Sequence, residues 1–236
     1  MKAFLRPITP AIATKIVAAR HALAFKEGLP PANILQGTIN NLASLLEPQR
    51  FTEELDIVDE TGRPSGLKAQ RWAIHLLGLP HRVVRVILLT PDNHVLLQLR
   101  GSRRSSVANK IDFSAGGHIE VGATRLETAF KELEEEIGLT YEDLLEGRLF
   151  PGTLTERVVV AKPAYWTLNF EWTYFYFGRM RDQALDRVFF NDGEASGTLS
   201  LDLSDLSELC IRPNVSLSFL LCLPVLKENL WLFLQE

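Results

Sequence analysis

Hydrophobic residues in the first fifty positions recur at helical spacing in two stretches, residues 11–25 and 34–46. Pro10 stands directly before the earlier stretch, where proline can start a helix, and a Gly-Leu-Pro-Pro turn at 28–31 separates the two. Neither stretch carries residues that indicate a particular chemistry. We therefore predict an N-terminal helical extension, residues 1–50, that serves for packing or dimerisation.

From residue 53 the pattern changes to short apolar runs bounded by turn residues. A short strand is predicted at 55–58, a turn at 59–64 and a helix at 67–77. Residues 83–89 are β-branched and apolar, which predicts a buried strand. A Pro-Asp-Asn turn at 91–93 then returns the chain antiparallel over 94–99.

The second half of the chain continues this mixture of strands and helices. A strand is predicted at 111–115 and a helix from residue 125, followed by strands at 155–161, 172–177, 188–190 and 198–203. Two helices close the chain, at 204–209 and at 215–234, the second bent at Pro224. Because strands and helices do not alternate regularly, we expect an α+β or three-layer α/β/α sandwich with a mixed sheet.

Composition narrows the class of protein. Of 236 residues, 46% are hydrophobic and 23% charged, which is typical of a globular chain, so we treat residues 51–236 as one folded domain. The net charge of −4 argues against nucleic-acid binding. The apolar stretch 215–234 is broken by Pro224 and a Lys-Glu-Asn triplet, which argues against a membrane span.

Two observations bear on location. Cys210 and Cys222 form no CxxC pair, which fits a reducing compartment. Five Lys and Arg residues with no acid precede Glu27, as in an organellar transit peptide, but this segment has no serine and also fits a helix. We expect a cytoplasmic protein, with organellar targeting as the alternative.

The most informative segment is Gly-Gly-His-Ile-Glu-Val-Gly-Ala-Thr-Arg-Leu-Glu-Thr-Ala-Phe-Lys-Glu-Leu-Glu-Glu-Glu-Ile-Gly-Leu at 116–139. Thr124 and Glu127 form a capping box, which starts a helix at about residue 125, and Gly138 is a plausible stop. At about 100° per residue, one stripe of the helix is apolar and predicts its core face. The stripe consists of Leu126, Ala129, Phe130, Leu133 and Ile137.

Glu132, Glu135 and Glu136 fall on a second arc of the same helix, about 100° wide. Three carboxylates on one face repel one another unless a cation lies among them, and the one nearby cation, Lys131, is expected on the far side with Glu127. Mg²⁺ takes a few carboxylates together with water and substrate phosphates. The arc therefore predicts a Mg²⁺ site, with Mn²⁺ as the alternative metal.

The residues around this arc suit a diphosphate. The turn of Gly116 and Gly117 precedes the helix, and Arg103, Arg104 and Lys110 lie in a basic loop at 101–110. Guanidinium groups pair with phosphate through two parallel hydrogen bonds. We therefore expect these five residues to bind the diphosphate of a small-molecule substrate.

Together these residues resemble the Nudix box, G-x5-E-x7-R-E-U-x-E-E-x-G-U, in which U is a bulky aliphatic residue. Aligned on Gly117, the chain matches at Glu132, Glu135 and Glu136, and also at Leu133, Gly138 and Leu139. The resemblance implies the Nudix α/β/α sandwich, with the glutamates as metal ligands. It also implies Mg²⁺-dependent cleavage of a diphosphate linkage in a nucleoside diphosphate derivative or related organic diphosphate.

The chain departs from the box at two positions. Ala123 stands where the family has Glu, and Lys131 where it has Arg. In the family these two residues form an ion pair that supports the loop–helix–loop, so we expect an altered support, with Glu127 and Lys131 as a partial replacement. A degenerate domain that binds a nucleotide or a partner without turnover is the alternative function.

Further residues resemble the isopentenyl-diphosphate-isomerase-like branch of Nudix proteins, among them His75 to Gly78, His81 and Arg82, and the strand before the box. True isomerases carry a cysteine acid in that strand, and this chain has none there. In that branch an acid lies where Glu171 stands, so Glu171 is predicted to supply a further catalytic carboxylate, with Glu156 and Glu194 as competitors. Glu135 is the predicted residue that polarises the attacking water.

Overall fold

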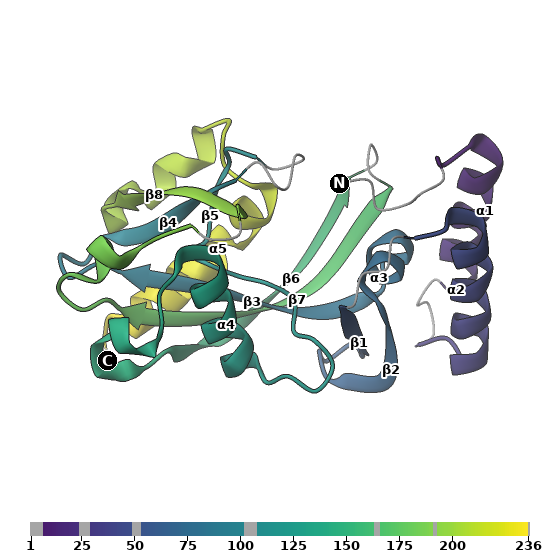
Figure 1. Cartoon of the computed structure of the whole chain (residues 1–236), viewed down its shortest axis with the longest axis horizontal. Coiled ribbons are helices and arrows are strands. Elements are labelled where there is room, and N and C mark those ends of the chain that lie inside the picture. Colours follow the sequence, from purple (N-terminus) through teal and green to yellow (C-terminus); the bar gives the residue numbers. More distant parts are fainter. Residues whose placement is uncertain are drawn as a thin grey trace. The chain divides into compact units, whose positions relative to one another are not determined.

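The computed structural model describes residues 7–23, 29–48, 53–101, 108–162, 166–190 and 193–235. It divides into two compact units. The first comprises Val83–Val158 and Thr173–Glu236, and the second comprises Lys2–Arg82 and Val159–Trp172. Figure 1 shows the elements of both. The division at residue 50 made from the sequence stays a prediction.

The second unit begins with the two expected helices, α1 (Pro10–Ala22) and α2 (Ala32–Leu46). The Thr9 hydroxyl caps α1, and Glu47 ends α2 in a left-handed conformation. A two-stranded antiparallel sheet of β1 (Glu54–Val58) and β2 (Pro64–Gln70) follows, and then α3 (Arg71–Leu77). Both N-terminal helices are confirmed.

The helix predicted at 67–77 is wrong in its first four residues. Residues 67–70 belong to β2, where Ala69 pairs with Leu55 and Lys68 with Asp56. Pairing with β1 outweighs the helical spacing of the apolar residues, because strand formation depends on the neighbouring strand more than on local preference. The helix therefore starts only at Arg71.

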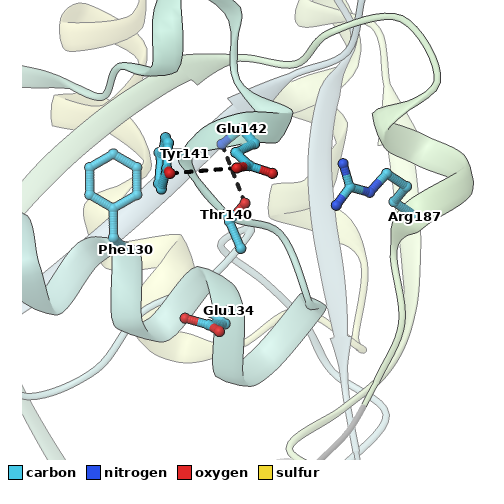
Figure 2. A pocket seen from close by; sticks show the side chains of 6 residues that line it. All are labelled: Phe130, Glu134, Thr140, Tyr141, Glu142 and Arg187. Carbon is cyan, nitrogen blue, oxygen red and sulfur yellow. Dashed lines mark hydrogen bonds between the residues drawn. The ribbon is translucent and has the colours of Figure 1, made fainter.

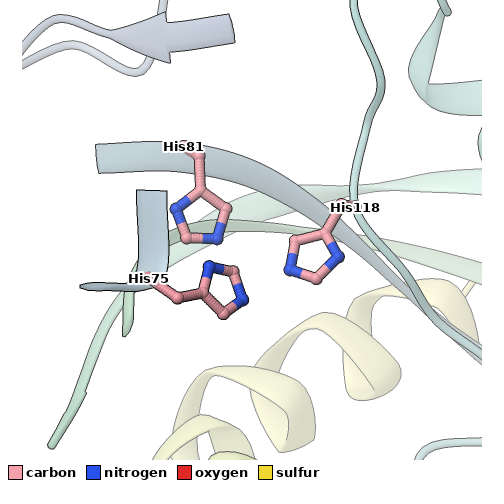
Figure 3. Close-up of side chains that lie close together, drawn as sticks. All are labelled: His75, His81 and His118. Atoms are coloured by element: carbon pink, nitrogen blue, oxygen red, sulfur yellow. The ribbon is translucent and has the colours of Figure 1, made fainter. Parts of the chain in front are cut away.

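The core of this unit joins its helices to its small sheet. The buried residues run from Ile16 in α1 to Leu79 beyond α3. Arg20 of α1 donates to the carbonyl oxygens of Leu76 at 2.8 Å and Trp166 at 2.9 Å. The rings of His75 and His81 stack with centroids 5.1 Å apart (Figure 3). The N-terminal helices thus have the packing role expected of them.

The first unit is built on a six-stranded sheet. Three of its strands, β3, β6 and β7, also include residues that are assigned to the second unit. The strands are β3 (Pro80–Leu89), β4 (Val95–Arg100), β5 (Ile111–Asp112), β6 (Phe150–Lys162), β7 (Thr167–Arg179) and β8 (Ala195–Leu201). The order is β5-β4-β3-β7-β6, with β8 also paired to β4. Strand β4 pairs antiparallel with β3, β5 and β8. The amide of Met180 donates to Leu89 where both β7 and β3 end, so these neighbours run parallel. The sheet is mixed, as predicted.

Helices α4 (Arg125–Ile137) and α5 (Leu217–Phe233) lie on the two sides of this sheet in Figure 1, which gives the three-layer arrangement. On α5, Phe219 contacts Phe113 and Phe233 contacts Phe177, with ring centroids 5.0 and 5.5 Å apart. Pro224 lies within α5. In the part of the chain that the structure describes, no helix is long and apolar enough to cross a membrane.

Several predicted boundaries in this unit are corrected. The strand predicted at 111–115 is only Ile111–Asp112, and Ala115 instead forms an isolated bridge with Val86. Residues 188–190 are not a strand, because they follow the short 3₁₀ helix Ala184–Arg187 and Phe189 packs against Gly138. The strand at 198–203 is shifted to Ala195–Leu201 by pairing with β4, and the helix at 204–209 is a 3₁₀ helix, Leu203–Ile211. Further 3₁₀ turns lie at Tyr141–Asp143 and Leu145–Gly147.

Candidate metal and diphosphate site

Helix α4 has the ends that its sequence predicts. Thr124 accepts from the amide of Glu127, whose carboxylate accepts in turn from the amide of Thr124, and together these bonds complete the capping box. Gly138 ends the helix with a φ of 73°. The core face is narrower than expected: Ala129, Leu133 and Ile137 are buried, but Leu126 is exposed and Phe130 only half-buried.

The three predicted metal ligands project from α4 at different depths. Glu136 is 2% exposed, Glu132 is half-buried and Glu135 is exposed. One oxygen of Glu136, Oε2, accepts from the Gly116 amide at 3.0 Å and from Nε2 of Gln98 at 2.8 Å. The glycine turn and α4 therefore meet at the carboxylates, as the motif predicts.

Gly117 makes room for Glu132. A methyl group on Gly117 would lie 2.0 Å from Oε1 of Glu132, which is far inside van der Waals contact. At Gly116 a methyl group would lie 2.6 Å from the carbonyl oxygen of Val84. The two glycines are thus required for different reasons. Gly116 leaves room for the backbone of Val84, and Gly117 leaves room for the carboxylate of Glu132.

Two carboxyl groups of the arc have raised pKa values. Burial raises the pKa of Glu132 to about 8, and the charges of Glu136 and Glu135 add to the effect. Burial also raises the pKa of Glu136 to about 7, although the Arg100 charge and the bonds from Gly116 and Gln98 oppose this. Such carboxyls are stabilised in their ionised form by a cation placed among them. Carboxylate oxygens around a glycine cradle fit a hard divalent cation, and the resemblance places the metal here too.

Residues of β4 and β5 form a polar layer beside Glu136. Nη1 of Arg100 donates to Oδ2 of Asp112 at 3.1 Å, and the hydroxyl of Ser216 donates to Oδ1 of Asp112 at 2.9 Å. Gln98 and Arg100 are 1% and 8% exposed. Sequence reasoning missed Gln98, Arg100 and Asp112. Gln98 and Arg100 could have been found from the sequence, because they stand two residues apart in an otherwise apolar strand and so lie on the same face.

Glu194, named as a competitor for the further carboxylate, lies at the entrance to β8. Its carbonyl oxygen accepts from the Gly101 amide at 2.6 Å. A side chain on Gly101 would collide with the backbone of Gly193, so the two segments can cross closely only because Gly101 is glycine. Burial is the main cause of the raised pKa of Glu132 and Glu136, and the charge of Glu194 adds a smaller effect in the same direction.

The support of the loop differs from the expectation. Nζ of Lys131 forms an ion pair with Oε1 of Glu120 at 2.8 Å, rather than with Glu127, whose carboxylate is used in the capping box. The charges of Glu135 and Glu132 also act on Lys131, so this lysine lies beside the carboxylate arc and not on the far side. Glu120, three residues before Ala123, thus ties the loop to α4.

The other predicted residues have separate outcomes. Arg103 and Arg104 lie outside the described residues, as does the side chain of Glu156. Lys110 is half-buried, with Nζ 3.4 Å from the carbonyl oxygen of Val215. Glu171 belongs to the second compact unit, where it is 3% exposed and accepts from Asn169 at 2.9 Å. Its catalytic role stays a prediction.

A pocket of about 340 Å³ lies at the other side of α4 (Figure 2). At 100° per residue, Phe130 and Glu134 project roughly opposite to the carboxylate arc. The pocket is lined by Phe130, Glu134, Thr140, Tyr141, Glu142 and Arg187. Within it, the amide of Glu142 donates to the Thr140 hydroxyl at 3.3 Å. The pocket is therefore separate from the candidate metal site.

Comparison with known proteins agrees with the geometry. The sequence model of the NUDIX domain matches residues 79–213. The chain is 38% identical over 88 residues to Nudix hydrolase 3 of Arabidopsis thaliana, which is 37% of this chain and 11% of that protein. It is 35% identical over 86 residues to an uncharacterised Nudix hydrolase of Streptomyces coelicolor, covering 36% and 47% of the two chains.

A solved structure also shares the fold. The crystal structure of DR0079 from Deinococcus radiodurans superposes with a TM-score of 0.53 at 20% identity, covering 71% of this chain and 95% of that one. The match spans about half the length of two of the first curated relatives and 11% of the length of the Arabidopsis thaliana protein. The isomerase-like branch is not confirmed by these matches.

Proposed function

The chain belongs to the NUDIX domain family, and on this premise we propose that it is a Mg²⁺-dependent hydrolase of a diphosphate linkage. Its substrate is a small molecule, a nucleoside diphosphate derivative or related organic diphosphate. The observation that carries the proposal is the meeting of Glu132 and Glu136 with the glycine turn, at Gly117 and Gly116.

The metal ligands in this proposal are Glu132, Glu135 and Glu136. When bound, the cation supplies neutralisation of charge on the phosphate oxygens and orients the diphosphate. The first role of the protein's own side chains is to bind and polarise the attacking water molecule. Glu135 is exposed on the carboxylate arc, so its carboxylate is accessible to accept hydrogen bonds from an attacking water molecule.

The reaction adds water across one P–O–P linkage. The water molecule gives a proton to the Glu135 carboxylate and its oxygen bonds to one phosphorus, while the bond from that phosphorus to the bridging oxygen breaks and the bridging oxygen leaves with the other phosphate product. In the proposal Arg103, Arg104 and Lys110 bind the non-reacting phosphate oxygens, since cationic side chains stabilise phosphate through charge-assisted hydrogen bonds.

A further carboxylate from outside the box is also part of the proposal. Glu171 has the place that the isomerase-like branch suggests. Glu156 and Glu194 are the competitors, and the effect of the Glu194 charge on the pKa of Glu132 and Glu136 supports Glu194. Comparing Glu171→Gln, Glu156→Gln and Glu194→Gln in turnover decides among them, since the residue that acts loses rate when its charge is removed.

The test of the proposed function is a substrate panel with excess Mg²⁺. Nucleoside diphosphate sugars, dinucleotides, nucleoside triphosphates and thiamine diphosphate are incubated with the protein, and the phosphate products are followed by ³¹P NMR. We expect cleavage of at least one compound, abolished by EDTA and strongly reduced in Glu136→Gln. Tight binding of a panel member without cleavage would instead support the binding-module alternative, whose basis is Ala123.

A further inference from the structure

Gln98 has an unusual place for a glutamine, in the interior of the sheet. It lies opposite Asp112 of β5 and Thr198 of β8, and it is 1% exposed. With β4 paired on both of these strands, the backbone at Gln98 is held firmly. Its side chain therefore starts from a fixed point, which is what a residue needs if it is to set the position of another group.

That other group is the carboxylate of Glu136. Nε2 of Gln98 donates to Oε2 at 2.8 Å, and the Gly116 amide donates to the same oxygen at 3.0 Å. Two donors converge on one oxygen from β4 and from the glycine turn. No hydrogen bond from a described residue to Oε1 accompanies them, so Oε1 is the oxygen that remains available for a ligand.

The donors are neutral, and this matters for a metal ligand. An amide fixes the direction of a carboxylate without cancelling its charge, whereas a guanidinium would form an ion pair that competes with the metal. Arg100, two residues further along β4, is engaged by Asp112 at 3.1 Å. Glu136 thus has neutral hydrogen-bond donors, whereas Arg100 forms its hydrogen bond with Asp112 and acts on Glu136 through its charge.

The other end of the Gln98 amide argues against a purely structural role. Oε1 of Gln98 is buried with no hydrogen-bond partner among the described residues. Burying an unpaired carbonyl lowers stability, so an apolar residue would serve packing better at this position. What the glutamine provides, and an apolar residue cannot, is the hydrogen bond to Glu136.

We propose that Gln98 is a positioning residue of the metal site, which holds Oε2 of Glu136 so that Oε1 faces the metal. The inference rests on the proposed function, because it assumes that Glu136 is a metal ligand. Partners that orient a ligand in this way commonly change metal affinity by about 10- to 100-fold when they are removed.

The test measures Mn²⁺ binding by the free-ion EPR signal, which requires no substrate. Gln98→Met keeps the length and shape of the side chain and removes the donor. We expect its Kd for Mn²⁺ to rise by about 10- to 100-fold. Thr173→Val is the matched control, because Thr173 is fully buried and its hydroxyl has no partner among the described residues. Its Kd should stay within twofold of wild type.

Should Gln98→Met fail to fold, Gln98→Asn answers the same question, since it keeps the amide but withdraws it by one methylene. A folded Gln98 variant that binds Mn²⁺ within twofold of wild type, while Glu136→Gln loses binding, overturns the inference and leaves the proposed function intact. If Glu136→Gln also binds like wild type, the metal site itself is misplaced, and the failure is that of the proposed function.

Discussion

Replacing Gly117 by alanine should damage the site while leaving the fold in place. The new methyl group would lie 2.0 Å from Oε1 and 2.2 Å from Cδ of Glu132. To reach even a tight contact of about 3 Å, the carboxylate has to move by about 1 Å. Glu132 is the end of a flexible side chain, so the movement costs little folding free energy, and Gly117 has no left-handed φ that alanine would strain.

A movement of this size has a large effect on chemistry. A displacement of about 1 Å at a catalytic group can cost about 100-fold in rate. We therefore expect Gly117→Ala to lower kcat on the best substrate by about two orders of magnitude. By contrast, Gly116→Ala brings a methyl group to 2.6 Å from the backbone oxygen of Val84, which cannot move aside as easily, so it should also lower the melting temperature.

The assay combines steady-state kinetics with thermal denaturation. Gly37→Ala is the control, because nothing lies within 4 Å of the added methyl group in α2, and the change should raise stability by about 0.5–1 kcal/mol without altering kcat. Gly117→Ala with wild-type kcat and KM would refute the reasoning, since it would mean that Glu132 does not need to lie against the glycine turn.

Three further predictions concern the carboxylates and their support. Glu135→Gln should lower kcat by about 10²–10⁴-fold with an unchanged melting temperature, and wild-type turnover with excess Mg²⁺ would remove its role as the base. Glu120→Lys and Lys131→Glu should each lower the free energy of unfolding by about 0.2–1 kcal/mol, the usual worth of an exposed pair, and the double swap should restore part of it; equal losses in all three variants would argue against the tie. Because the pKa values of Glu132 and Glu136 are raised to about 8 and 7, the folded state binds the extra protons, so stability without metal should fall as pH rises from about 5 to 8. Melting curves in EDTA should show this fall and curves in excess Mg²⁺ should not, and a rise with pH in EDTA would contradict the sign.

The sequence was sufficient for the elements whose signals are local. The capping box at Thr124 and the stop at Gly138 placed α4 to the residue, and the turn at 91–93 placed β4 and β3. Where an element depends on a distant partner, local reasoning was wrong. Residues 67–70 have helical spacing but pair with β1, and Phe189, apolar in a strand-like run, packs on Gly138 instead.

In the candidate site, too, the residues set by local spacing could be predicted, whereas the contacts that depend on the fold could not. The spacing of the glutamates along one helix defines their arc, so Glu132, Glu135 and Glu136 could be named without a structure. The partner of Lys131 could not, because helical spacing favours Glu127, four residues before it, and only the path of the loop brings Glu120 within 2.8 Å. The departure at Ala123 therefore does not leave the helix without a tie to its loop.

Gln98 illustrates why the surroundings of a motif are harder to read than the motif. It lies 38 positions before Glu136, in another element, and the contact depends on the register of β4 and on the face of the sheet that α4 covers. A slip of one residue along β4 would turn Gln98 away and bring an apolar neighbour, Leu97 or Leu99, to the carboxylate. The pairing of β4 with β8 along its whole length, from Val95 to Arg100, is what fixes that register. In the proposed metal site, the position of Gln98 thus depends on the pairing of β4 with β8, and we expect changes that weaken this pairing to lower metal affinity.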